Sequence, residues 1–318
     1  MKPRILIGTP PPLLKRRVVD LQVAVVTGAN RSNGIGLALV RELAEAGYEV
    51  VGTYRDASNS GSLIALSRSD PRVTAIQLDV ASDESVSDFV KRFSEVFSQC
   101  DVLVNNAGMS SSPGTIVTSP VTELEMQLQV HAIGPVRLTQ AMLPYLRRSS
   151  DPPAKVAVIT STLGTMSGIG SGWTHYAPAK AAANALVKQM AASLTGQRVS
   201  VFSLHPGWVA TDIGGSGAPV SPRRSAQGLL SVITTCVRCQ KSLLVQPRTL
   251  HTLLLFLGCA VTLIPRRQLL QIKLFLHSPF LHKALPPRFK QGRLQRAARP
   301  SVAALVQNDI VSPAPRLL

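Results

Sequence analysis

Hydrophobic residues in the central part of the chain follow two alternating patterns. Short apolar runs, rich in β-branched residues, lie at 23–27, 49–54, 73–78, 101–105, 155–160 and 198–204. Runs of this kind are typical of strands that are buried on both faces of a parallel sheet. Between the runs, apolar residues recur with the helical period over 35–47, 83–98, 122–147 and 175–194. Ser82 is placed to cap the second of these helices.

The alternation of strands and helices predicts an α/β fold: a Rossmann-type, doubly wound parallel sheet in a single domain. We expect this domain to span residues 21–234, with ligands bound at the carboxyl ends of the strands. A basic, proline-rich leader (1–20) precedes it, and we expect the leader to be disordered. An atypical basic tail (235–318), rich in Leu and Pro, follows the domain. The tail has no regular alternation of strands and helices, so we do not expect it to form a second domain.

The formal net charge of +17 is concentrated at the two ends of the chain. Residues 1–20 hold five basic residues against one acidic residue, and residues 231–318 hold thirteen against one. The segment between them holds sixteen against fifteen. Because the predicted domain is nearly neutral and has no basic patch interleaved with aromatic residues, we do not expect it to bind nucleic acid.

Cysteines and apolar runs exclude several further classes of protein. The longest apolar run, 252–264, is shorter than the roughly 20 residues that a membrane span needs, so we expect no integral membrane span. Cys236 and Cys239 form a CxxC motif, but no second pair follows, so we expect no metal site. The four cysteines of the chain do not form a disulfide framework, which favours a reducing, cytoplasmic location.

A glycine-rich loop, TGANRSNGIG, joins the first predicted strand to the first predicted helix. Gly28 ends the strand, whereas Gly34 and Gly36 open the helix, where amide groups and the helix dipole favour a phosphate. This strand–loop–helix context predicts a dinucleotide site. Arg55 after the second strand, with Arg31 in the loop, favours NADP over NAD, because arginine accommodates the 2′-phosphate.

A second constellation, Ser161, Tyr176 and Lys180, follows the fifth predicted strand. Tyr176 and Lys180 are four residues apart and therefore share one helix face. Hydride transfer to a carbonyl carbon needs a proton donor at the oxygen, and a Tyr hydroxyl can serve if its pKa falls toward neutrality. A Lys cation about 4 Å away would supply roughly 4 kcal/mol at an effective dielectric of about 20. Ser161 would hold the substrate oxygen by a hydrogen bond.

With these residues the chain resembles the short-chain dehydrogenase/reductase family, in particular the carbonyl reductases related to sniffer and C-factor. The resemblance also rests on LDV (78–80), NNAG (105–108), VHAIGPVRLTQAMLPYL (130–146) and HPGWVATDIGG (205–215). It implies an NADP(H)-dependent carbonyl reductase or alcohol dehydrogenase that acts on a small-molecule carbonyl or alcohol, as a possible homodimer or homotetramer. It implies Ser161, Tyr176, Lys180 and His131 as catalytic residues, with tyrosine as the acid/base.

The resemblance also implies the residues that hold the cofactor. Asp79 would lie at the adenine, Asn105 to Gly108 beside the adenosine half, and Pro206, Gly207 and Thr211 around the nicotinamide, whose ribose Lys180 would bind. The full implied set is Gly28, Asn30, Arg31, Gly34, Ile35, Gly36, Arg55, Asp79, Val80, Asn105, Ala107, Gly108, Tyr176, Lys180, Pro206, Gly207, Val209 and Thr211.

The chain departs from the family pattern in three places. Two extra residues stand between Gly28 and Gly34, where the family has TGxxxGxG, and we expect them to bulge outward and leave the helix N-terminus usable. His131 occupies the place of an Asn in the family's proton relay, either as a structural histidine or as a partial substitute. The tail lacks the family's last strand, so it is a lineage-specific extension or, as we favour, a translated intron or shifted reading frame.

Two other functional classes stay open. One is a catalytically impaired nucleotide-binding relative that acts through interactions, and the other is a peripheral membrane protein held by the basic tail. The presence of Ser161, Tyr176 and Lys180 favours an enzyme over the first class. Pro265 interrupts the segment that would form a membrane-binding helix. The sequence does not name the substrate, whose pocket we expect Trp173, Trp208 and the loop after Asp212 to shape.

Overall fold

The computed structural model describes residues 21–110, 114–149, 153–170, 173–235, 252–257 and 260–265. Six parallel strands form the main sheet, in the order β3-β2-β1-β4-β5-β6. They are β1 (Val23–Val26), β2 (Glu49–Tyr54), β3 (Val73–Gln77), β4 (Val102–Asn105), β5 (Ala154–Ile159) and β6 (Val199–Leu204). The chain reverses its direction of winding between β1 and β4, so ligands are expected at the carboxyl ends of these two strands. This arrangement confirms the predicted Rossmann-type fold.

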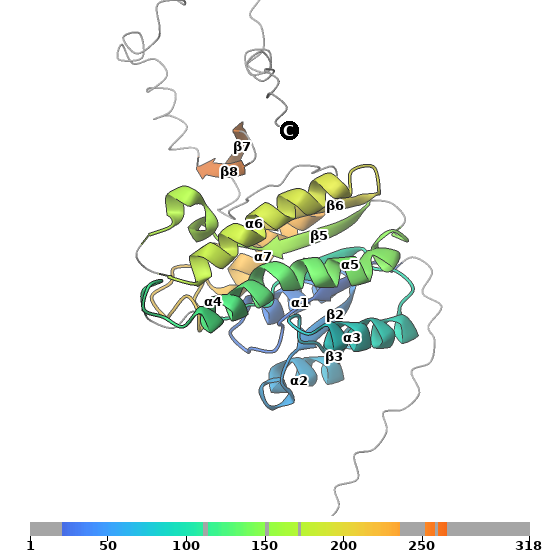
Figure 1. Ribbon diagram of the computed structural model, residues 1–318. Coiled ribbons are helices and arrows are strands. Elements are labelled where there is room, and N and C mark those ends of the chain that lie inside the picture. The colour runs from blue at the N-terminus through green and yellow to red at the C-terminus, as the bar shows by residue number, and fades with distance from the viewer. Residues whose placement is uncertain are drawn as a thin grey trace, which may run out of the picture. The chain divides into compact units, whose positions relative to one another are not determined.

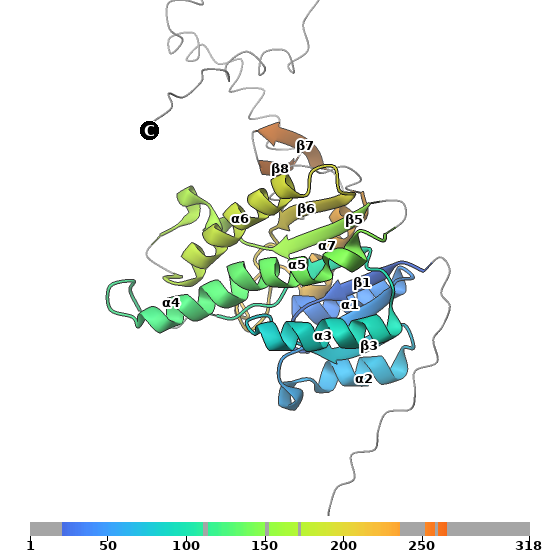
Figure 2. The same ribbon diagram turned by 45° about the vertical axis from the view of Figure 1, so that its right-hand side comes forward.

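Helices cover both faces of the sheet (Figure 1). On one face, α1 (Ile35–Glu45) packs against α7 (Pro222–Thr235). On the other face lie α3 (Asp83–Val96), α5 (Gly134–Leu146) and α6 (Tyr176–Ser193), and the turned view in Figure 2 separates the two layers. The chain also forms α2 (Gly61–Ser69) after β2 and α4 (Val121–Leu128) before α5.

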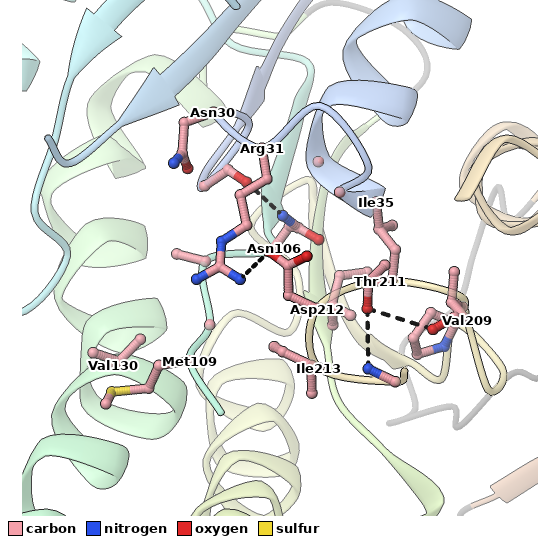
Figure 3. A pocket seen from close by; sticks show the side chains of 18 of the residues that line it. Asn30, Arg31, Ile35, Asn106, Met109, Val130, Val209, Thr211, Asp212 and Ile213 are labelled. Carbon is pink, nitrogen blue, oxygen red and sulfur yellow. Dashed lines mark hydrogen bonds and ion pairs between the residues drawn. The ribbon is translucent and has the colours of Figure 1, made fainter. Parts of the chain in front are cut away.

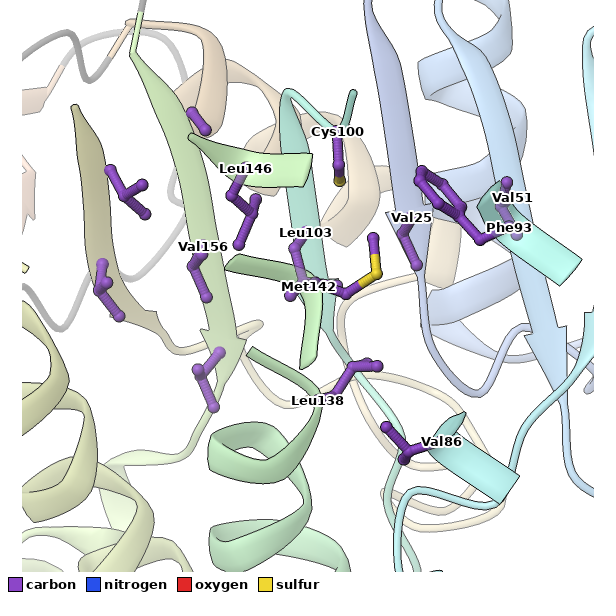
Figure 4. Packing of buried hydrophobic residues seen from close by; sticks show 14 of the residues in the cluster. Val25, Val51, Val86, Phe93, Cys100, Leu103, Leu138, Met142, Leu146 and Val156 are labelled. Carbon is purple, nitrogen blue, oxygen red and sulfur yellow. The ribbon is translucent and has the colours of Figure 1, made fainter. Parts of the chain in front are cut away.

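The core consists of two layers because side chains alternate between the faces of each strand. Ala24 and Val26 pack with α1 and α7, whereas Val25 packs with the opposite layer. In that layer Leu138 and Met142 of α5 are fully buried against the sheet (Figure 4). Burial of the apolar surface on both faces explains why the strands carry nearly continuous apolar runs.

The predicted helix over 122–147 is interrupted in the structure. Between α4 and α5 the chain forms one π-helical turn, η2 (Gln129–Ile133), which contains His131. Such turns are rare and occur often at functional sites. The sequence pattern also missed α2, in which Leu63 alone is fully buried, so its apolar period is weak. By contrast, the predicted cap is confirmed, since the Ser82 hydroxyl accepts a hydrogen bond from the Ser85 amide at the start of α3.

Two further strands, β7 (Thr252–Leu257) and β8 (Ala260–Pro265), pair antiparallel within the predicted tail. The sequence pattern did not predict strands there. The leader, the rest of the tail and the CxxC motif lie outside the described residues, so their expected lack of domain structure and metal stays a prediction. None of the described helices combines the length and the hydropathy of a membrane-crossing segment.

Candidate active site

A cavity of about 1300 Å³ opens at the carboxyl ends of the strands, next to the segments that follow β1 and β4. Its walls come from the glycine-rich loop after β1, the NNAG segment after β4, the start of α6 and the segment after β6. The volume exceeds the ~300–1,000 Å³ of a typical small-molecule pocket. It is therefore large enough for a dinucleotide together with a second, smaller molecule.

The glycine-rich loop is built so tightly that side chains are excluded at two positions. Gly28 has φ +66°, and a Cβ there would lie 2.8 Å from the Ala107 Cα. A Cβ at Gly36 would lie 2.4 Å from the Gly28 carbonyl oxygen and 2.6 Å from the Asn106 Nδ2. These glycines let β1, β4 and the first turn of α1 approach one another closely.

The first turn of α1 opens toward this cavity with its amide groups uncapped. Gly34 is the N-cap residue of this helix, and among the described residues no side chain accepts a hydrogen bond from the first amide groups. The first turn also contains no acidic residue. The amide groups of a helix N-terminus and the helix dipole attract an anion. The residues present therefore fit the pyrophosphate of a dinucleotide.

Ser32 and Asn33 of the widened loop are exposed, but both line the cavity, so the loop does not bulge away from it as expected. The loop also reaches the segment after β6. Asn33 Nδ2 donates to Asp212 Oδ1 at 2.9 Å, and Arg31 Nη1 lies 2.7 Å from Asp212 Oδ2 (Figure 3). The sequence suggested Arg31 as a second partner of a 2′-phosphate beside Arg55. In the structure the Arg31 guanidinium lines the cavity and pairs with Asp212 on the segment after β6, and its role at a 2′-phosphate stays a prediction.

Within the predicted range Asn105 to Gly108, Asn106 forms part of the cavity wall after β4, whereas Asn105 does not. Asn106 Nδ2 donates to the carbonyl oxygens of Thr27, at 2.9 Å, and Gly28, at 3.2 Å. Asn105 ends β4 and is buried, and among the described residues its amide group has no hydrogen-bond partner. Neighbouring side chains of a strand point to opposite sides, so only one of the two asparagines can face the cavity. That alternation is the signal that could have identified Asn106.

Ser161, Tyr176 and Lys180 converge on the cavity from two elements. Ser161 follows β5 and caps a short 3₁₀ turn, where its Oγ accepts from the Leu163 amide at 3.1 Å. Tyr176 is the first residue of α6, and Lys180 lies one turn later. Lys180 Nζ donates to the Ile159 carbonyl oxygen at 2.7 Å and lies 5.4 Å from the centre of the Tyr176 ring. The helix therefore fixes the ammonium group beside the phenol.

Burial controls the charge states of this pair. It raises the pKa of Tyr176 to about 12, against the opposing effect of a hydrogen bond with Ser161. Burial also lowers the pKa of Lys180 to about 7. The sequence predicted that a Lys cation would bring the pKa of Tyr176 toward neutrality. In the structure desolvation dominates, because both groups are enclosed, so Tyr176 holds its proton at neutral pH.

His131 lies on the π-helical turn, beside the reactive pair. Its Nε2 lies 3.0 Å from the Met109 carbonyl oxygen, and its ring meets the Tyr176 ring edge-on with 5.1 Å between centres. Burial and the nearby Lys180 hold the pKa of His131 well below 6.5, so the ring is neutral. With its proton on Nε2 the neutral ring donates to that carbonyl oxygen and presents Nδ1 as an acceptor, whereas the other tautomer accepts from the Met109 amide at 3.3 Å; Nδ1 has no partner among the described residues.

A sequence model of the short chain dehydrogenases matches residues 22–219 of the chain. The chain belongs to this family. Its relatives include the C-signal of Myxococcus xanthus, 37% identical over 134 residues, which cover 42% of this chain and 80% of the relative. They also include the rhamnolipid-biosynthesis 3-oxoacyl-acyl-carrier-protein reductase of Pseudomonas aeruginosa, 32% identical over 188 residues, which cover 58% of this chain and 72% of the relative.

Solved structures of the same family superpose on this short-chain dehydrogenase. The carbonyl reductase Sniffer of D. melanogaster gives a TM-score of 0.66 at 27% identity, over 71% of this chain and 97% of that chain. The NADPH-bound carbonyl reductase from chicken fatty liver gives a TM-score of 0.64 at 27% identity, over the same shares. These likenesses confirm the resemblance to the sniffer and C-factor group.

The short-chain dehydrogenase cavity brings together nearly all the residues that the sequence suggested for cofactor and catalysis. Apart from Asn105, each of them lines it: Gly28, Asn30, Arg31, Gly34, Ile35, Gly36, Arg55, Asp79, Val80, Ala107, Gly108, His131, Ser161, Tyr176, Lys180, Pro206, Gly207, Val209 and Thr211. His205 also lines the cavity and was missed. Burial lowers its pKa to about 4, and its Nδ1 accepts from the Thr162 amide at 3.4 Å. An apolar strand end gave no signal for such a residue.

Proposed function

We propose that this short-chain dehydrogenase is an NADP(H)-dependent oxidoreductase that transfers hydride between the nicotinamide and a small carbonyl or alcohol. One observation carries the proposal: Ser161, Tyr176 and Lys180 meet in a cavity whose other end is an uncapped helix N-terminus. The first group suits proton transfer at a carbonyl oxygen, and the second suits a pyrophosphate. A cytoplasmic location and a homodimer or homotetramer remain predictions.

NADP(H) is the cofactor that these residues favour. The helix N-terminus at Gly34 would hold the pyrophosphate, and Arg55, at the end of β2, would pair with the 2′-phosphate. With the Arg31 guanidinium engaged by Asp212, the preference for NADPH rests on Arg55. An NADPH-bound carbonyl reductase among the solved relatives supports the same assignment.

Tyr176 would act as the general acid in the reducing direction. When bound, NADPH supplies the hydride that adds to the carbonyl carbon, and Tyr176 gives its phenol proton to the carbonyl oxygen. The Ser161 hydroxyl would hold that oxygen, while a protonated Lys180 stabilises the tyrosinate that remains. Burial favours the protonated phenol at neutral pH, which suits Tyr176 to the role of general acid in reduction.

A catalytically impaired, nucleotide-binding relative is the second candidate, and His131 is the observation that favours it. An imidazole has replaced the amide that the family places in the proton relay. The unpartnered Nδ1 can accept a hydrogen bond, but the neutral ring has no second N–H to donate beside it.

Titration of the full-length protein with NADPH, followed by assay against a panel of aldehydes and ketones, tests the proposal. We expect saturable NADPH binding and loss of NADPH absorbance with at least one carbonyl compound. Binding without turnover across the panel would favour the impaired relative. An absence of NADPH binding would contradict both candidates.

A further inference from the structure

The chain has only two tryptophans, Trp173 and Trp208, and both line the cavity. Neither is part of the core, because Trp173 is 39% exposed and Trp208 58% exposed. Large aromatic side chains that line a pocket and are partly exposed, rather than packed in the core, indicate a surface that binds a ligand. The tryptophans come from two segments, one just before α6 and the other just after β6.

Trp173 is held beside the catalytic tyrosine by a strained backbone. Its φ is +62°, a conformation that costs a bulky residue about 1–3 kcal/mol. Its carbonyl oxygen accepts from the Ala177 amide at 2.9 Å, which ties it to the first turn of α6. Its ring centre lies 5.4 Å from that of Tyr176, at an interplanar angle of 52°. Strain of this kind persists where the position of a side chain matters for function.

Trp208 lines the cavity, and its polar edge is already satisfied. Its Nε1 donates to the Gly214 carbonyl oxygen at 2.7 Å. A Cβ at Gly214 would lie 2.0 Å from the Val209 carbonyl oxygen, so a glycine is needed for this close turn. The indole ring is therefore fixed in place, and its π face is what remains to contact a ligand.

The cavity also offers apolar surface to a substrate. Met109, Leu163 and Ile213 contribute apolar side chains, and Figure 3 shows Met109 and Ile213 on the side of the pocket away from Asn30.

Three Arg or Lys side chains line the cavity in the described part of the chain, and each is either held by another group or placed on the β2 side of the sheet. Arg31 is paired with Asp212. Lys180 is tied to the Ile159 carbonyl oxygen. Arg55 follows β2, which β1 and β4 separate from β5.

We propose that Trp173 and Trp208 form an aromatic subsite that binds the planar ring of a neutral aryl ketone or aldehyde beside Tyr176. This inference rests on the proposed function and names its substrate class. A flat ring stacks on an indole face more favourably than a puckered ring of the same size.

A matched pair of ketones tests the subsite. Acetophenone and cyclohexyl methyl ketone have the same carbon skeleton and differ in the planarity of the ring. Dissociation constants are measured by calorimetry on full-length protein saturated with NADP⁺, so that no turnover occurs. We expect acetophenone to bind about tenfold more tightly. Phenylglyoxylate, which adds a carboxylate next to the same aryl ketone, is the anionic probe and should bind more weakly than acetophenone.

Variants assign the preference to the tryptophans. Trp173→Leu and Trp208→Leu should each lower the binding ratio about threefold or more, whereas Trp173→Phe and Trp208→Phe should keep most of it. Met166→Leu is the control, since Met166 is 84% exposed and lies outside the cavity. Trp173→Gly accepts a positive φ without strain and should fold stably while losing the preference.

An equal affinity of the wild type for both ketones, or a ratio unchanged in both leucine variants, would overturn the subsite. Tighter binding of phenylglyoxylate than of acetophenone would overturn the neutral substrate class. The ratio does not depend on turnover. If it holds while NADPH is not consumed, the subsite stands and the proposed oxidoreductase activity fails.

Discussion

Arg31 and Asp212 stand 181 residues apart in the sequence, yet Arg31 Nη1 lies 2.7 Å from Asp212 Oδ2. Asn33, in the widened glycine-rich loop, donates to the other carboxylate oxygen at 2.9 Å. The longer loop thus joins the cofactor side of the cavity to the segment after β6. Both charged side chains are about half exposed, so the ion pair itself contributes only about 0.2–1 kcal/mol.

A double-mutant cycle on Arg31→Ala and Asp212→Ala measures what this link does for the cofactor. We expect each single variant to weaken NADPH binding about two- to fivefold, and the double variant to be no weaker than the singles. The ion pair of Arg223 and Glu42, at 3.0 Å and outside the cavity, is the control and should not change NADPH affinity. Strictly additive effects of Arg31→Ala and Asp212→Ala would show that the two residues act separately.

Arg55 sets the cofactor preference in this account. Arg55→Asp should weaken NADPH binding roughly 10- to 100-fold, because a charged hydrogen bond to the 2′-phosphate is replaced by repulsion. NADH binding should change little, so the ratio of dissociation constants flattens or reverses. Arg92→Asp makes the same charge change on the exposed side of α3 and should leave the ratio as it is. An unchanged ratio in Arg55→Asp contradicts the assignment.

The pH dependence of reduction should come from Lys180. Its pKa of about 7 makes it a cation below that pH, and the cation stabilises the tyrosinate that forms as the proton leaves. Turnover at saturating NADPH and ketone should therefore fall as pH rises through about 7.

His131 should not contribute to that profile, because its pKa lies well below 6.5 and the ring stays neutral between about pH 6 and 8. His131→Asn should keep the same inflection, with turnover equal to or above that of the wild type. A lost inflection, or a turnover that drops sharply, would show that the imidazole itself works in the reaction.

The domain should end near Thr235, the last residue of α7. Lys155 Nζ donates to the Thr234 carbonyl oxygen at 3.2 Å, so the end of this helix is fixed to β5. Beyond it the tail has thirteen basic residues from 231 onward against a single acid, which leaves almost no charge pairing of its own. Limited proteolysis of the full-length protein should yield a stable fragment that ends near residue 235. A stable fragment that extends past about residue 300 would contradict this boundary.

The sequence predicted the sheet well because buried parallel strands leave continuous apolar runs that local reading detects. The sequence predicted that Ser161, Tyr176 and Lys180 lie together, because Ser161 follows a predicted strand and the other two residues lie one turn apart on the next predicted helix. It did not predict the π-helical turn at His131, since apolar periodicity continues across it.

Contacts between segments that are distant in the sequence could not be predicted from local patterns. The Arg31–Asp212 pair depends on how a longer loop folds in space, and the high pKa of Tyr176 depends on how completely the folded chain excludes water. Neither the ion pair nor the raised pKa can be predicted from the residues next to these positions in the sequence.

Replacement of the Tyr176 hydroxyl tests the central claim most directly. NADPH consumption with a reducible ketone is compared between the wild type and Tyr176→Phe, and NADPH binding is followed by quenching of tryptophan fluorescence, which arises at Trp173 and Trp208 in the cavity. The account predicts that Tyr176→Phe binds NADPH with nearly unchanged affinity and loses at least about 10²-fold in turnover, because only the proton donor is removed. Turnover retained by Tyr176→Phe at the wild-type rate would contradict it.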